Sequence, residues 1–208
     1  MSYRAEFFAV DGVVIAALPE TGSLRDVVEG VDGVLLENAT WHPLDGTAAR
    51  SVGELRLAPD DIHVAVGDAE DVGPVHAQWH DVTVDVGPYR VRGQMPTMPG
   101  FDPGRALTRP TGEFVLLRDV EIALVGSDDR DSVSHRSALV NRYVVDHVEA
   151  DMMLGFFFPG AEMVVTGGSD SNSAGTDSTA GPAAPPAVAP APPGTAGTTS
   201  EVSGPATA

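Results

Sequence analysis

The chain has 208 residues, no cysteine, and thirty carboxylates against twelve arginines and no lysine, which gives a formal net charge of −18. The lack of cysteine excludes disulfides, thiolate-bound zinc and cysteine nucleophiles. The acidic field repels phosphate at long range and therefore argues against DNA or RNA as a partner.

The first seventy residues show the signals of a small β-rich unit. Two apolar, β-prone runs on either side of Asp11-Gly12 predict a hairpin whose turn is centred on these two residues. A serine N-cap, an early acidic residue and a terminal glycine predict a short helix over 23–30. Further strands are predicted from Val34 to a turn at residues 45–46, over 55–57 and over 62–66.

The same order of signals returns from residue 79. Alternating valines over 81–86, a Gly87-Pro88 turn and the run 89–95 predict a second hairpin. A proline- and glycine-rich connector over 96–110 stands where the first series has its helix. A long strand over 114–124, a polar loop over 126–136, and shorter strands near residues 139–140 and 144–148 complete the second series.

We interpret the two series as an internal duplication with a period near 80 residues. Val14 to Pro19 aligns with Val91 to Pro96, and Val34-Leu35-Leu36 aligns with Val115-Leu116-Leu117. Ile62 aligns with either Val144 or Val145. The predicted fold is mainly β, with two tandem small β-barrels at 1–70 and 79–151, a linker at 71–78, a hydrophobic segment at 152–165 and a disordered tail at 166–208.

The stretch from Tyr89 to Val148 resembles the small β-barrels of the Sm-like and SH3-like class. The resemblance is carried by Phe114-Val115-Leu116-Leu117-Arg118-Asp119-Val120, and by Val140-Asn141 followed by Val144-Val145. The stretch is also similar to small bacterial domains of unknown function with the same strand, Val-Asn, Val ending. This resemblance implies the fold. It does not imply RNA binding, because Sm-like proteins usually begin with a helix and read RNA from first-half loops, whereas residues 96–110 carry no such signature.

His76 and His80 are the weak candidates for a metal site, because they stand four residues apart. A zinc site needs three or four ligands, and no glutamate lies between these two histidines. We interpret them as solvated linker residues and expect no metal or cofactor. The alternative, a histidine-metal enzyme, requires that one of them converge with His42, His63 or His147.

The segment over 152–165 holds three of the seven phenylalanines and half of the six methionines. We interpret it as packing between the two copies. In the alternative interpretation it is a docking surface, since methionine and phenylalanine suit adaptable contacts. Strand alternation predicts Phe156 and Phe158 on one side and Phe157 on the other. The candidate interaction residues are Met152, Met153, Phe156, Phe157 and Phe158.

The tail is rich in Gly, Ser, Thr, Ala and Pro, and it cannot bury enough apolar surface to offset its ordering entropy. The start lacks a signal-peptide core and no apolar run reaches bilayer length, so we expect a cytoplasmic protein. We predict a non-catalytic interaction or assembly module with a protein partner or self-association. The alternative of an Sm-like nucleic-acid binder requires clustering of Arg90, Arg92, Arg105, Arg109 and Arg118 on one face.

Overall fold

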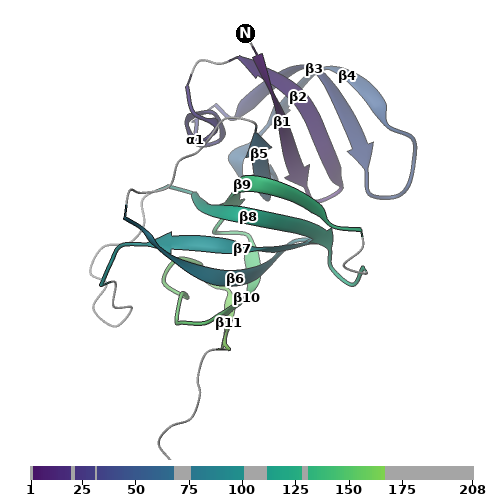
Figure 1. The fold of residues 1–208 in the computed structure, drawn as a ribbon. Coiled ribbons are helices and arrows are strands. Elements are labelled where there is room, and N and C mark those ends of the chain that lie inside the picture. The colour runs from purple at the N-terminus through teal and green to yellow at the C-terminus, as the bar shows by residue number, and fades with distance from the viewer. Residues whose placement is uncertain are drawn as a thin grey trace, which may run out of the picture. The chain divides into compact units, whose positions relative to one another are not determined.

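The computed structural model describes residues 2–19, 22–30, 32–67, 76–100, 112–127 and 131–166. Within these ranges the chain is mainly β, as predicted, and its eleven strands belong to one sheet (Figure 1). The strands are β1 (Ser2–Ala9), β2 (Gly12–Pro19), β3 (Val34–Pro43), β4 (Arg50–Leu57), β5 (Val64–Gly67), β6 (Gln78–Val86), β7 (Tyr89–Thr97), β8 (Phe114–Leu124), β9 (Val133–Asn141), β10 (Val145–Ala150) and β11 (Glu162–Val165). A short helix, α1 (Leu24–Val28), and a 3-10 turn, η1 (Pro59–Asp61), complete the described elements.

The first hairpin forms where it was predicted, but its turn lies one residue earlier. Ala9 pairs with Gly12, so the loop residues are Val10 and Asp11 rather than Asp11 and Gly12. Gly12 is a strand residue against which the Trp41 ring packs. A Cβ on Gly12 would lie 2.5 Å from Trp41 Cζ2. Glycine is therefore required here for close approach of the ring and not for the turn.

The predicted helix is α1, and its start is fixed by a capping box. The Ser23 hydroxyl accepts a hydrogen bond from the Asp26 N–H, and the Asp26 carboxylate accepts one from the Ser23 N–H, each at 3.1 Å. The helix is also tied to β8. Arg25 Nη1 donates to the Phe114 carbonyl at 2.7 Å, and the Phe114 N–H donates to Glu29 Oε1 at 3.3 Å.

Each half of the sheet repeats one strand order. The first half reads β5-β1-β2-β3-β4 and the second reads β10-β6-β7-β8-β9. The halves are joined by the antiparallel pairing of β5 with β9, with Val64 opposite Val140 and Ala65 opposite Leu139. The described strands form an open sheet, so the two predicted closed barrels are not observed. The second half does not close into a barrel, because the edge of β9 that would have to pair with β10 is paired with β5 instead.

The ladders of the two halves have matching registers. Phe7 faces Val14 in β1·β2, as Val84 faces Val91 in β6·β7. Leu36 faces Leu55 in β3·β4, as Leu117 faces Ala138 in β8·β9.

The long middle strands, β3 and β8, also share a backbone irregularity. Asn38 has φ 52° and Asp119 has φ 50°, each two positions beyond the corresponding buried leucine. Non-glycine residues rarely adopt this left-handed conformation, so its recurrence at one place in both strands is informative.

The last strands of the two halves pair in a similar way with the first strands. Ala65 faces Phe7 in β5·β1, and Val148 faces Val84 in β10·β6. The β10·β6 ladder shifts its register between Val145 and His147, whereas the paired residues of β5·β1 run without a shift.

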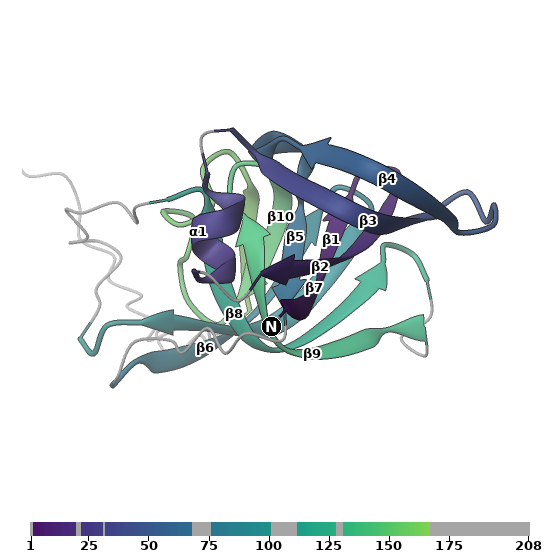
Figure 2. The same ribbon diagram turned by 90° about the horizontal axis from the view of Figure 1, so that it is seen from above.

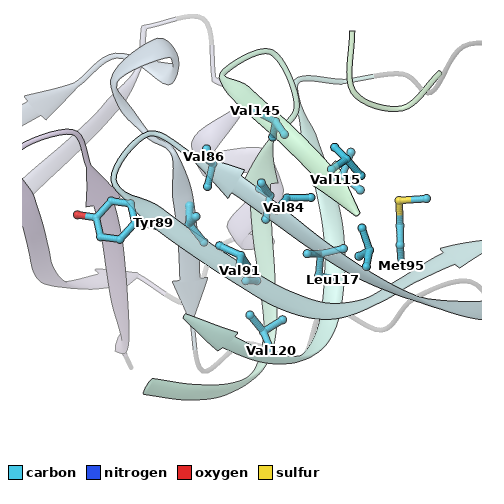
Figure 3. Packing of buried hydrophobic residues seen from close by; sticks show 14 of the residues in the cluster. Val84, Val86, Tyr89, Val91, Met95, Val115, Leu117, Val120 and Val145 are labelled. Atoms are coloured by element: carbon cyan, nitrogen blue, oxygen red, sulfur yellow. The ribbon is translucent and has the colours of Figure 1, made fainter. Parts of the chain in front are cut away.

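Two buried clusters form the core. One is built mainly from the first half, and the other is built mainly from β6, β7, β8 and β10 (Figure 3). The two faces of β8 serve different clusters. Leu117 and Val120 face the second cluster, whereas Phe114 and Leu116 pack in the first. Leu116, a residue of the second half, therefore packs in the core of the first half.

Several strands begin earlier than the sequence predicted. Gln78, assigned to the linker, opens β6, and Val133, assigned to the polar loop, opens β9. Arg50 opens β4, of which only residues 55–57 were predicted. Residues 68–75, 101–111 and 128–130 lie outside the described residues; they include parts of the predicted linker, of the connector and of the polar loop.

Thr166, the first residue of the predicted tail, is hydrogen-bonded to the end of β10. Its N–H and Oγ1 both donate to the Ala150 carbonyl, at 2.8 and 3.0 Å. Residues 167–208 of the predicted tail lie outside the described residues.

Deleting residues 167–208 is expected to leave the thermal midpoint of unfolding unchanged within about 1 °C, because the deleted sequence lacks core-forming side chains. Differential scanning calorimetry of the two chains measures this. A clear fall in the midpoint would show that the tail packs on the body.

Candidate interaction surface

The predicted Met/Phe segment is mostly turns and not one strand. Residues 155–157 form a turn, closed by the Phe157 N–H donating to the Leu154 carbonyl at 2.8 Å, and only residues 162–165 form a strand. Alternation therefore does not govern the phenylalanines. Phe158 is 1% exposed, while Phe156 and Phe157 are both half-buried and contact one another edge to face at 6.2 Å.

The segment serves the second core. Leu154 and Phe158 are fully buried members of that cluster, and Met152 packs against it. Arg142 Nη2 donates to the Phe156 carbonyl at 3.2 Å, which fixes the turn to the end of β9. Of the candidate interaction residues, Met153 is the most exposed, at 54%.

The same segment covers one end of the sheet. β11 pairs in parallel with β10, with Val148 opposite Met163 and Ala150 opposite Val165. Figure 1 shows β11 at the end of the sheet remote from β4. The outer hydrogen-bonding edge of β10 is thus occupied by the chain itself.

The opposite end of the sheet is a free edge. Among the described strands, β4 pairs only with β3, so one row of its N–H and C=O groups has no strand partner. Figure 2 shows β3 and β4 together at this margin of the sheet. Such a row is a template on which a further strand can add.

The solvent-facing side of β3 and β4 at this edge carries positive and negative side chains. Arg56 lies opposite Leu35, and Glu54 lies opposite Glu37. Arg56 Nη1 donates to the Asp32 carbonyl at 2.7 Å. In the described part of the chain neither Glu37 nor Glu54 makes an ion pair, and like charges directly opposite one another are destabilising. The sequence reasoning missed this surface because the glycine and charges of β4 hid its strand pattern.

The arginines proposed for nucleic acid are interleaved with carboxylates where they are described. Arg90 pairs with Asp85 at 2.7 Å, and Arg92 lies opposite Glu121. Arg118 lies over the Trp79 ring at 3.8 Å and donates to Gln94. A hollow on this part of the sheet is lined by more acids than bases: Asp81, Arg92, Asp119, Glu121, Glu149 and Asp151. Residues 105 and 109 lie outside the described ranges.

The two candidate metal histidines lie in different environments. His76 is exposed, but His80 is a buried residue of β6 and not a solvated linker residue. His80 Nε2 lies 3.0 Å from Thr97 Oγ1, and its Nδ1 lies 3.4 Å from Asp151 Oδ1. Over the described residues, no three histidine, aspartate or glutamate side chains converge on a potential metal position.

His63 lies at the joint between the halves. Its N–H donates to the Phe8 carbonyl and its carbonyl accepts from the Asn141 N–H, both at 2.9 Å. The ring packs on Gly87, where a Cβ would lie 2.4 Å from Cε1. Nearby, the Tyr89 hydroxyl donates to the Ala9 carbonyl at 2.7 Å. Burial lowers the pKa of His63, and the carboxylates of Asp146 and Asp61 oppose this shift only in part.

The free energy of unfolding is expected to fall between pH 7 and pH 5. The folded-state pKa of His63 lies below that of the unfolded chain, about 6.5, so the unfolded chain takes up the proton first as the pH falls. The contribution of neutral His63 to the free energy of unfolding is fully present above the pKa of His63 in the unfolded chain. It is lost as the pH falls towards the lower pKa of His63 in the folded chain. Urea unfolding at several pH values measures the slope. His63→Gln should flatten it, and His42→Gln, at an exposed site, should not; an unchanged slope in His63→Gln would contradict the prediction.

No protein-family model, curated protein or solved structure that we compared with the chain matches it. Within the described residues, no helix has the length and apolar character required to span a bilayer.

Proposed function

We propose that the chain is a non-catalytic interaction module whose partner adds a strand to β4. The observation that carries this proposal is the asymmetry of the two sheet ends. Among the described strands the sheet ends at β4, which has eight residues, and at β11, which has four, so the longer row of backbone groups without a strand partner lies on β4. Strand addition takes its affinity from such backbone groups and its specificity from the side chains beside them. The cytoplasmic location expected from the sequence remains part of this proposal.

The proposal includes a duplicated architecture. The two halves are two copies of one five-stranded unit of the small-barrel type, left open rather than closed. Support comes from the common strand order, the matching registers and the left-handed residues at Asn38 and Asp119. The joint inside the chain is itself strand addition, since β9 of one copy adds to β5 of the other.

Selection of extended peptides from a random displayed library tests the function. We expect selected peptides to slow amide exchange over residues 50–57 and to lose binding to Leu55→Lys, because an inward-facing charge blocks a sheet edge. Leu124→Lys, at an exposed site on β8, is the matched control. Peptides that protect another region, or that bind Leu55→Lys equally well, would refute strand addition at β4.

A further inference from the structure

The free edge of β4 can pair with itself. Resting on the proposed function, we propose that the added strand is β4 of a second copy of this chain, antiparallel about a two-fold axis at Leu55. Pairing between unlike sheet ends would set β4 against β11, which has only four residues to the eight of β4. Pairing β4 with β4 joins two like ends, and such a contact closes the assembly as a dimer instead of a filament.

The side chains of β4 suit this register. With Leu55 opposite Leu55 of the second copy, Arg56 lies opposite Glu54 of the second copy, and Glu54 lies opposite Arg56. Leu57 falls opposite Gly53, which has open space around its Cα. The arrangement therefore forms two ion pairs from one strand sequence.

The faces also agree. Arg56 and Glu54 both lie on the outer face with their β3 partners Leu35 and Glu37, whereas Leu55 lies opposite the buried Leu36. Residues directly opposite in an antiparallel pair share a face. The ion pairs would therefore form on the outer face, and the two Leu55 side chains would meet on the core side.

The charges select this register over its neighbours. Moving the axis by one residue sets Glu54 against Glu54 or Arg56 against Arg56, and both alternatives place like charges opposite one another. In the chosen register Arg56 of the second copy stands beside the opposed carboxylates of Glu37 and Glu54. β4 itself holds two arginines and one glutamate in a chain with net charge −18, so its own charges reduce the repulsion between copies at this strand.

Sedimentation equilibrium of the full chain and its charge variants tests the pairing. We expect a concentration-dependent dimer for the wild type. Arg56→Glu and Glu54→Arg should each weaken it at least about tenfold, since each sets like charges opposite one another. The double variant Arg56→Glu/Glu54→Arg should restore the dimer, because the swapped pairs are again complementary. Circular dichroism checks that each variant is folded, and failure of the double variant to recover would overturn the register.

Cross-linking tests the axis directly, since the chain has no cysteine of its own. A short bis-maleimide should join Leu55→Cys into a covalent dimer. It should not join Ser51→Cys, which lies on the same strand away from the axis. A strictly monomeric wild type would overturn the self-pairing, yet strand addition would stand if selected peptides still protect β4. A dimer insensitive to all β4 variants would also overturn the self-pairing, because the contact would then lie elsewhere on the chain.

Discussion

Leu116→Ala is expected to lower the free energy of unfolding by about 2 to 5 kcal/mol, the range for a large-to-small change in a packed core. Leu116 is 8% exposed and packs with Phe114 and Leu139 in the cluster of the first half. The truncation would leave a cavity where β8 of the second half meets that cluster. Urea denaturation followed by tryptophan fluorescence measures the loss.

Leu35→Ala is the matched control for Leu116→Ala. Leu35 holds the same place in β3 that Leu116 holds in β8, but it is 44% exposed. Its truncation should cost less than about 0.5 kcal/mol, as is usual for surface positions. Similar losses at the two sites would show that the halves do not share a core at Leu116.

This contrast explains what the sequence could and could not predict. Apolar, β-prone runs correctly placed the hairpins and the long strand β8. The run Phe114-Val115-Leu116-Leu117 is apolar on both faces of β8, but the sequence could not show that the two faces contact different clusters. Leu35 and Leu116 look alike in sequence, yet only Leu116 packs against the other half of the sheet.

Strand edges were harder still to predict. β4 contains Gly53 and three charged residues, which are poor strand signals, and it is held in the sheet by the ladder to β3. The prediction of two closed barrels was wrong for a related reason. Which strand edge pairs with which is a long-range choice, and the sequence of β9 does not reveal that β5 will occupy its edge.

The hydrophobic segment over 152–165 is placed by tertiary contacts and not by a strand pattern in its own sequence. In the first half, Leu116 and Leu139 of the second half complete the core. In the second half, Leu154 and Phe158 of the hydrophobic segment pack in the core. β11 then pairs with the edge of β10, so the hydrophobic segment both fills the core and forms the last strand at this end of the described sheet.

Phe158→Asp is therefore expected to unfold the second half or the whole chain. Phe158 is 1% exposed among apolar side chains, and an unpaired carboxylate in such a site costs several kcal/mol, a large part of the stability of a small domain. Met153→Asp, in the same segment but 54% exposed, should leave the fold intact. Circular dichroism and amide exchange over β6, β7 and β10 would separate the two variants. If Phe158→Asp kept these strands protected, the segment would be an appendage of the sheet and not the closing part of its core.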